Sequence, residues 1–159
     1  MAILVFFVFL LPAAEESTAP PFSVKDSKGN LVDSQALLKS GPVILWFWNS
    51  CCGLKKQQLK ALKDIHQRYK SKGLTIIAVN EDEPKKAAEV KNTIAINRIP
   101  FIIIMDQNGD LMRRYHARAV PQIFCIAQDG KIQYEKAGYI AGDDKDLITA
   151  MELFSANEK

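Results

Sequence analysis

The chain has 159 residues, of which 48% are hydrophobic and 25% are charged, and its formal net charge is +3 at pH 7. This length is enough for one domain with a full core and too short for two, and the composition is that of an ordinary soluble globular protein. A charge of +3 with no block of basic residues gives no support for nucleic-acid binding. We therefore expect one globular domain with no nucleic acid among its partners.

The N-terminus begins with 14 uncharged, strongly apolar residues, followed by Glu15 and Glu16. This run is shorter than the ~20 residues that span a bilayer, and it resembles the apolar core of a secretion signal with small residues near its end. No Lys or Arg precedes it, so the usual basic start is missing. We expect residues 1–14 to be a signal peptide or apolar leader, 15–21 a linker and 22–159 a single domain. An uncleaved anchor and a start further upstream remain the alternatives.

Hydrophobic patterning in the first half predicts a hairpin, a buried strand and a helix. Residues 22–24 and 31–32 flank a polar turn and predict a small hairpin, which a brief helical turn from Ser34 follows. The uninterrupted apolar run 43–48 is typical of a strand that is buried on both faces. Over residues 52–70 apolar side chains recur at helical spacing, so we expect a helix there.

The second half continues this alternation and ends in a hairpin and a helix. We expect strands over 74–79, 101–105, 123–127 and 132–134, and helices over 84–92 and from Asp143 or Asp144 to 154. The short turn 128–130 indicates that the last two strands are antiparallel. This order predicts an α/β fold of three layers, in which a central mixed sheet carries helices on both faces and an N-terminal hairpin is added.

A pair of cysteines, Cys51 and Cys52, lies where the strand 43–48 gives way to the expected helix. The first N–H groups of a helix have no partner within the helix and carry the positive end of its dipole, which stabilises a thiolate. A dithiol motif would place its second cysteine three residues after Cys52, but that position holds Lys55. The junction is suited to thiol chemistry, yet half of the dithiol is missing.

The cysteine count gives no disulfide framework, because three is an odd number. A bridge between the adjacent Cys51 and Cys52 would close a strained ring. Cys125 lies in an apolar run, where a buried and inert thiol is expected. No His/Cys spacing indicates a metal site, and we expect neither a metal nor a cofactor.

Four segments carry a resemblance to a known family. They are Phe47-Trp48-Asn49-Ser50, Val79-Asn80-Glu81-Asp82-Glu83, Val120-Pro121-Gln122-Ile123-Phe124 with Asp129-Gly130-Lys131-Ile132, and Gly138-Tyr139. In these segments the chain resembles thioredoxin-fold proteins, and within that fold the TlpA/ResA group of exported thiol–disulfide oxidoreductases (redoxins). The resemblance runs from about residue 21 to residue 154, nearly all of the expected domain.

The resemblance assigns roles to individual residues. Cys52 aligns with the family's nucleophile, and Glu83 aligns with an acid near the redox centre, where it would either relay protons or be a solvated acid. Pro121 aligns with the family's cis-proline, and the backbone beside it, at Val120, would pair with a bound peptide like an added strand. Trp48 would be either core or the rim of the site, where it would contact substrate.

Lys55 replaces the family's resolving cysteine, so Cys52 cannot store an oxidising equivalent as an internal disulfide of that motif. We expect thiol–disulfide exchange through Cys52, with the resolving thiol supplied by a protein or small-thiol partner. The resemblance implies export, to the periplasm or to a membrane anchor facing outside the cytoplasm. A redox-inactive module that binds peptides in the cis-proline groove is the alternative. A thiol peroxidase is disfavoured, because Thr or Ser would stand three residues before the reactive cysteine, where this chain has Trp48 or Asn49.

Overall fold

The structure, a computed structural model, describes residues 17–50 and 56–156 and is built around a five-stranded sheet. The strand order is β5-β4-β3-β6-β7, with β3 (Val43–Trp48), β4 (Thr75–Asn80), β5 (Ile102–Met105), β6 (Gln122–Ile126) and β7 (Ile132–Ala137). β3, β4 and β5 are parallel, whereas β6 runs antiparallel to both β3 and β7. The predicted mixed sheet is confirmed, and β3 is its central strand.

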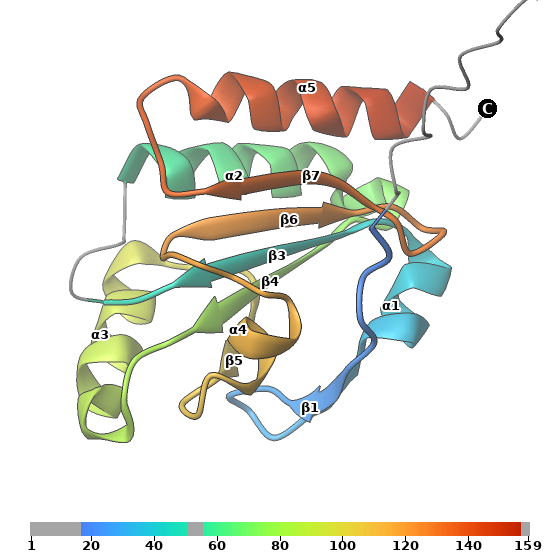
Figure 1. Cartoon of the computed structure of the whole chain (residues 1–159). Coiled ribbons are helices and arrows are strands. Elements are labelled where there is room, and N and C mark those ends of the chain that lie inside the picture. Colours follow the sequence, from blue (N-terminus) through green and yellow to red (C-terminus); the bar gives the residue numbers. More distant parts are fainter. Residues whose placement is uncertain (1–16, 51–55, 157–159) are drawn as a thin grey trace, which may run out of the picture.

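Helices cover both faces of this sheet, as predicted (Figure 1). They are α1 (Ser34–Ser40), α2 (Lys56–Tyr69), α3 (Ala87–Asn97), α4 (Asp110–Arg114) and α5 (Asp143–Ala156), with short 3-10 turns at η1 (Lys70–Lys72) and η2 (Pro84–Lys86). α2, α3 and α5 contribute buried side chains to one face, and α1 and α4 contribute them to the other. In Figure 1, α2 and α5 lie side by side along the upper face.

The central strand separates two hydrophobic cores, because successive side chains of a strand point to opposite faces. Ile44, Trp46 and Trp48 join the core beneath α2 and α5, whereas Val43, Leu45 and Phe47 join the core on the side of α1 and α4. All six side chains of β3 are buried. This explains why the strand shows no hydrophobic alternation in the sequence.

The N-terminal part of the domain is a small hairpin with a leading segment that is tied to the sheet. β1 (Ser23–Lys25) and β2 (Leu31–Asp33) are antiparallel, which confirms the predicted hairpin. Before it, Thr18 forms an isolated bridge with Lys131, and the N–H of Ala19 donates to the carbonyl of Gly130 at 2.8 Å. The described part of the segment that we expected to be a linker thus packs on the turn between β6 and β7.

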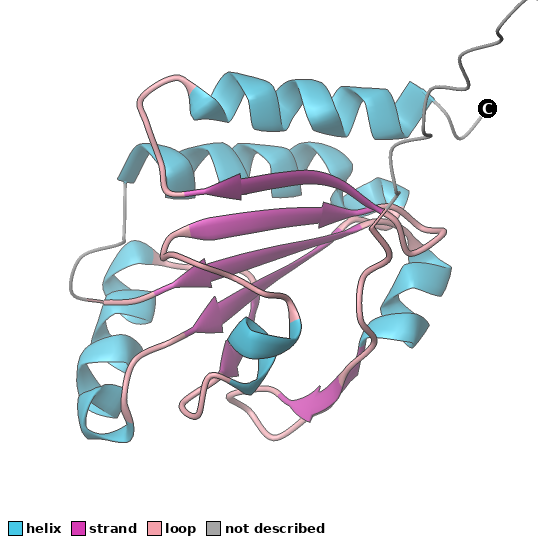
Figure 2. Cartoon of the chain, in the orientation of Figure 1, coloured by secondary structure: helices cyan, strands magenta, loops and turns pink. Residues whose placement is uncertain are grey.

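Two helices differ from the sequence prediction. α3 continues to Asn97, five residues beyond the expected end at 92. α4 was not predicted at all, and the long loop that follows it leads across the molecule to β6 (Figure 2). Within the ranges that the structure describes, no helix is long and apolar enough to cross a bilayer. The apolar leader 1–14 lies outside the described residues.

Candidate functional site

The expected redox junction lies at the end of the central strand. β3 ends at Trp48, and the helix that follows, α2, begins at Lys56. Cys51, Cys52 and Lys55 lie outside the described residues. What the structure defines is the frame on either side of them: Asn49 and Ser50 after β3, the first turns of α2, and the loops after β4 and α4.

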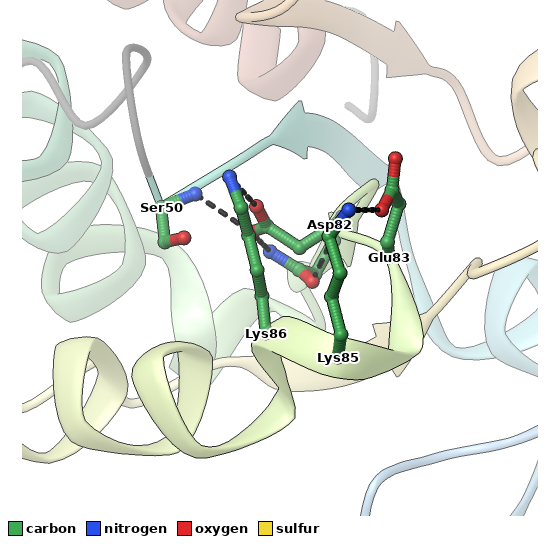
Figure 3. Close-up of polar contacts among 6 residues, drawn as sticks. Ser50, Asp82, Glu83, Lys85 and Lys86 are labelled. Atoms are coloured by element: carbon green, nitrogen blue, oxygen red, sulfur yellow. Dashed lines mark hydrogen bonds and ion pairs between the residues drawn. The ribbon is translucent and has the colours of Figure 1, made fainter.

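The carboxylate of Asp82 fixes the last described residue before the junction (Figure 3). The backbone N–H of Ser50 donates to Oδ2 of Asp82 at 2.7 Å, and Nδ2 of Asn80 donates to the same oxygen at 2.8 Å. Nζ of Lys86 lies 3.7 Å from Oδ1, and only 2% of the Asp82 side chain is exposed. A buried carboxylate with this many donors is a strong structural contact, so Asp82 holds the start of the junction against the end of β4.

Glu83, the acid that the resemblance places near the redox centre, takes no part in the contact between Asp82 and Ser50. Its side chain is 66% exposed and forms an ion pair with Lys85, away from the Ser50 contact in Figure 3. The hydrogen bond and charge of Lys85 lower the pKa of Glu83. Glu83 is thus a solvated acid, one of the two states that the sequence left open, and its action on Cys52 stays a prediction.

Sequence reasoning missed Asp82, although strand register contains the signal that would have found it. Trp48 pairs with Asn80 across β3 and β4, and the N–H of Glu81 donates to the carbonyl of Trp48 at 2.9 Å. The pairing therefore continues one residue past β4. Asp82 lies two positions after Asn80, so both side chains are on the same face of the sheet. Glu83 does not have this spacing from Asn80.

Glu81 forms a second acidic contact, with Asp106 on the opposite face of the sheet. Burial, followed by the charge of Asp106 and a hydrogen bond with it, raises the pKa of Glu81 to about 8. Oδ1 of Asp106 accepts from the N–H of Asp110 and Oδ2 accepts from the N–H of Met112, both at 2.9 Å. The two oxygens of Asp106 therefore accept the hydrogen bonds at the start of α4. With a pKa of about 8, Glu81 is protonated beside Asp106 at neutral pH.

The Val120–Pro121 peptide bond is cis, which confirms the expectation from the resemblance. Gln122 lies opposite Phe47 in the antiparallel register, so Pro121 lies beside the end of β3. Oε1 of Gln122, which is fully buried, accepts from the N–H of Arg118 at 2.7 Å and from that of Ala119 at 3.3 Å. Pro121 is buried and Val120 is half-buried. Hydrogen bonds to the buried Gln122 thus fix the proline loop next to the junction.

Trp48 belongs to the core rather than to the rim of the site, the two places that the sequence left open. Its side chain has no exposed surface, and its ring stacks on that of Trp46 with centroids 5.5 Å apart. Nε1 of Trp46 donates to Oε1 of the buried Gln58 at 3.1 Å, which joins β3 to α2. Contact of Trp48 with a substrate stays a prediction.

Cys125 and His66 lie in structural surroundings. Cys125 is free and buried, as predicted, and burial raises the pKa of its thiol. His66 packs edge-on against Phe101, and burial lowers its pKa. Among the described residues, no three His, Cys, Asp or Glu side chains are grouped closely enough to hold a metal ion.

Comparison with known sequences places this frame in a family. The profile of the AhpC/TSA family matches residues 16–135. Over 120 residues the chain is 31% identical to the thiol-disulfide oxidoreductase ResA of Bacillus thuringiensis. This alignment covers 76% of this chain and 68% of the relative. It is 27% identical to the sporulation thiol-disulfide oxidoreductase A of Bacillus subtilis, over 87% of this chain and 84% of the relative.

Solved structures agree with this assignment. A crystal structure from Chlorobium tepidum, assigned as a thiol:disulfide interchange protein DsbE, superposes with a TM-score of 0.79 at 26% identity and covers 89% of this chain and 97% of its own. A thiol:disulfide interchange protein from Bacteroides superposes with a TM-score of 0.71 at 25% identity, over 92% and 93% of the two chains. This chain therefore belongs to the AhpC/TSA family and, within it, to the thioredoxin-like thiol–disulfide oxidoreductases related to ResA.

Proposed function

We propose that this protein exchanges thiols and disulfides through one reactive cysteine, Cys52. The Cys52 thiolate attacks one sulfur of a partner disulfide, forms a mixed disulfide and expels the other sulfur as a thiolate. A thiol of a second molecule, as its thiolate, then attacks the partner's sulfur in that mixed disulfide and restores the Cys52 thiolate. The partner leaves joined to the second thiol, so the disulfide is transferred and nothing else is consumed.

The proposal is supported by the family frame around the junction together with the residue spacing after Cys52. The frame around the junction comprises the strand end held by Asp82 and the cis-proline loop held by Gln122. The position three residues after Cys52 is Lys55, and Cys125, a residue of β6, is buried in the core. An external thiol is therefore needed to complete the exchange.

Activation of Cys52 follows from its place before a long helix. α2 has 14 residues, and its first turn contains no acidic side chain that would oppose a thiolate. The helix dipole and the positive charges of Lys55 and Lys56 both favour the charged form of a nearby thiol. The partner class is a protein thiol or disulfide, or a small thiol, and no cofactor takes part.

We propose that the domain acts outside the cytoplasm. The support is the uncharged, strongly apolar leader 1–14, which Glu15 and Glu16 follow. Whether the leader is cleaved or holds the domain at a membrane decides between a periplasmic and an anchored protein. Fractionation of the native host, with mass spectrometry of the mature N-terminus, separates these two cases.

A non-catalytic binding module is the second candidate, because the solvated state of Glu83 and the missing resolving cysteine both fit a site without turnover. In that case the groove beside Pro121 would bind peptides and Cys52 would be unreactive. A peroxidase remains disfavoured, since neither Trp48 nor Asn49 supplies the hydroxyl that such enzymes place before the cysteine.

The alkylation rate of Cys52 as a function of pH tests the proposal. The background is Cys51→Ser with Cys125→Ala, since a serine hydroxyl at the buried position 125 would lack a partner. We expect an apparent pKa below the ordinary thiol value of ~8.5, and Lys55→Ala should raise it. A Cys52 that reacts no faster than a free thiol at neutral pH, or whose pKa is indifferent to Lys55, would instead favour the binding module.

A further inference from the structure

A hollow of about 490 Å³ lies on the surface between α4 and the loop that leads to the cis-proline. It is lined by Gly109, Met112, Arg113, His116, Ala117 and Arg118. Met112 and Ala117 are half-buried and pack on the core beneath α4, whereas Arg113, His116 and Arg118 are exposed. The hollow thus combines an apolar floor with a basic rim.

The charge of this rim is not balanced locally. No acidic residue lines the hollow, and Asp110, the acid of α4, already pairs with Arg113. In the described part of the chain, the side chain of Arg118 has neither a hydrogen bond nor an ion pair. Arg114, next to the hollow, donates to the carbonyl of Pro21 at 2.8 Å, which leaves its positive charge uncompensated. Residues 110–118 carry three arginines against one aspartate.

The rim is held in place rather than carried on a loose loop. Tyr115 OH donates to the carbonyl of Pro20 at 2.9 Å, which fixes the end of α4 to the N-terminal segment. The N–H of Arg118 donates to the buried Gln122 at 2.7 Å. Arg118 precedes Pro121 by three residues, which can span at most about 10 Å. A segment that pairs alongside Val120 would therefore pass within reach of the Arg118 guanidinium.

We propose that this hollow binds an acidic side chain of a polypeptide partner docked along the loop 115–121. The inference rests on the proposed function, in which a partner lies beside the cis-proline, and it names the partner class: a thiol or disulfide protein with Glu or Asp within a few residues of its reacting cysteine. The guanidinium groups match a carboxylate, and the apolar floor suits the methylene stem of a glutamate. The exposed rim makes this attraction salt-sensitive.

Binding of two matched peptides tests the proposal without using Cys52. Both are extended 12-residue peptides with a neutral fluorophore and with Ser in place of cysteine, and they differ only in having Glu or Gln at the flanking positions. Anisotropy with the full chain should show tighter binding of the Glu peptide, and added salt should reduce the difference. Arg118→Gln should weaken binding of the Glu peptide about two- to five-fold, as expected for one exposed ion pair, and leave binding of the Gln peptide unchanged.

Arg98→Gln is the matched control, because Arg98 is an exposed arginine at the end of α3 and its loss changes the net charge equally. A charge reversal, Arg118→Glu, should make the protein prefer a third peptide with Lys at the same positions, which a merely unfolded loop would not do. Thermal unfolding of each variant confirms that it is folded.

Three outcomes would overturn the inference. The Glu and Gln peptides could bind equally, Arg118→Gln and Arg98→Gln could weaken binding alike, or S-methylglutathione could displace the Glu peptide with the same dependence on Arg118. The last result would assign the hollow to a small anionic thiol instead. Because these peptides carry no sulfur, an unreactive Cys52 would refute the exchange mechanism and leave this binding test unaffected.

Discussion

At the scale of single residues, the neighbouring acids Glu81 and Asp82 have opposite environments on the two faces of one strand end. Asp82 accepts hydrogen bonds from Ser50 and Asn80, so its carboxylate is matched by donors. Glu81 lies beside a second carboxylate, Asp106, and its pKa rises to about 8. Asp82 therefore holds the start of the junction, and Glu81 is protonated near α4.

The proton on Glu81 should make stability fall as pH rises from about 4.5 to about 8, because over this range the folded chain keeps a proton that the unfolded chain has released. Glu81→Gln imitates the neutral acid and should remove this slope. At pH 8.5 we expect the variant to be more stable than the parent by about 1–2 kcal/mol, a value discounted for partial exposure, with little difference near pH 5.

Urea unfolding from pH 5 to pH 9 measures this effect, and Glu83→Gln provides the control because it makes the same chemical change at an exposed acid. Stability curves of the Glu81→Gln variant and the parent that stay parallel across the range would show that Glu81 does not hold its proton.

Asp82→Asn should lower the apparent pKa of Cys52. Cys52 follows Ser50 by two residues, so its Cα lies within about 8 Å of the Cα of Ser50, and a carboxylate near a thiolate disfavours the charged form. Asparagine keeps an oxygen for the Ser50 N–H and removes the charge. We expect a decrease of about 0.3 to 1 pH unit in the alkylation profile, whereas Asp82→Ala should also lower stability. An unchanged pKa with Asp82→Asn would limit Asp82 to a structural role.

At the scale of elements, the sequence predicted the long or strongly apolar segments and missed α4, a short helix that begins at the side chain of one acid. β3 is an uninterrupted apolar run, β4 and β6 are apolar except at their ends, and α2 has apolar residues at helical spacing, so their patterns indicate these elements directly. α4 has only five residues, and it begins where both oxygens of Asp106 accept its N–H groups. No periodic pattern can develop over so short a helix.

In the candidate site, too, sequence patterns predicted some residues and could not predict others. The cis-proline could be predicted because a contiguous segment carries it, and so could the burial of Cys125, which lies in an apolar run. Asp82 and Glu83 are adjacent acids with the same chemistry in the sequence. Only the register of β3 with β4 and the position of Lys85 determine which of them is buried and which is solvated.

The turn that leads into β4 should tolerate no side chain. Gly73 has φ +88°, and a Cβ at that position would lie 1.9 Å from the carbonyl oxygen of Ser40. Gly29 has nearly the same φ, +87°, with no atom within 4 Å of its Cβ position. Gly29→Ala should therefore cost only the backbone strain, about 1–2 kcal/mol, and Gly73→Ala should cost at least about 2 kcal/mol more.

Urea unfolding of the two alanine variants makes this comparison with φ held constant. Equal losses of stability would mean that the α1–β3 turn moves away from Gly73 at little cost, and that the contact with Ser40 does not fix the start of β4.

At the scale of the whole molecule, the chain has the thioredoxin-like fold of its relatives, and the position three residues after Cys52 holds Lys55. Lys55→Cys should restore the dithiol, form an internal disulfide with Cys52 and create insulin-reducing activity that the parent lacks. Lys56→Cys is the control, since it adds a thiol one residue along, rotated by about 100° around the helix. A Lys55→Cys variant that forms the disulfide but stays inactive would indicate a groove adapted to binding alone.

The central claim, a single reactive thiol resolved from outside, is tested most directly by intact mass after incubation with an excess of 2-hydroxyethyl disulfide. We predict one mercaptoethanol adduct per chain, mapped to Cys52 by peptide analysis, and return to the starting mass when a second thiol is added. A monomer lighter by two hydrogen atoms would contradict the claim, because Cys51 or Cys125 would then have displaced mercaptoethanol from Cys52 to form an internal disulfide. The absence of any adduct on Cys52 would contradict it as well.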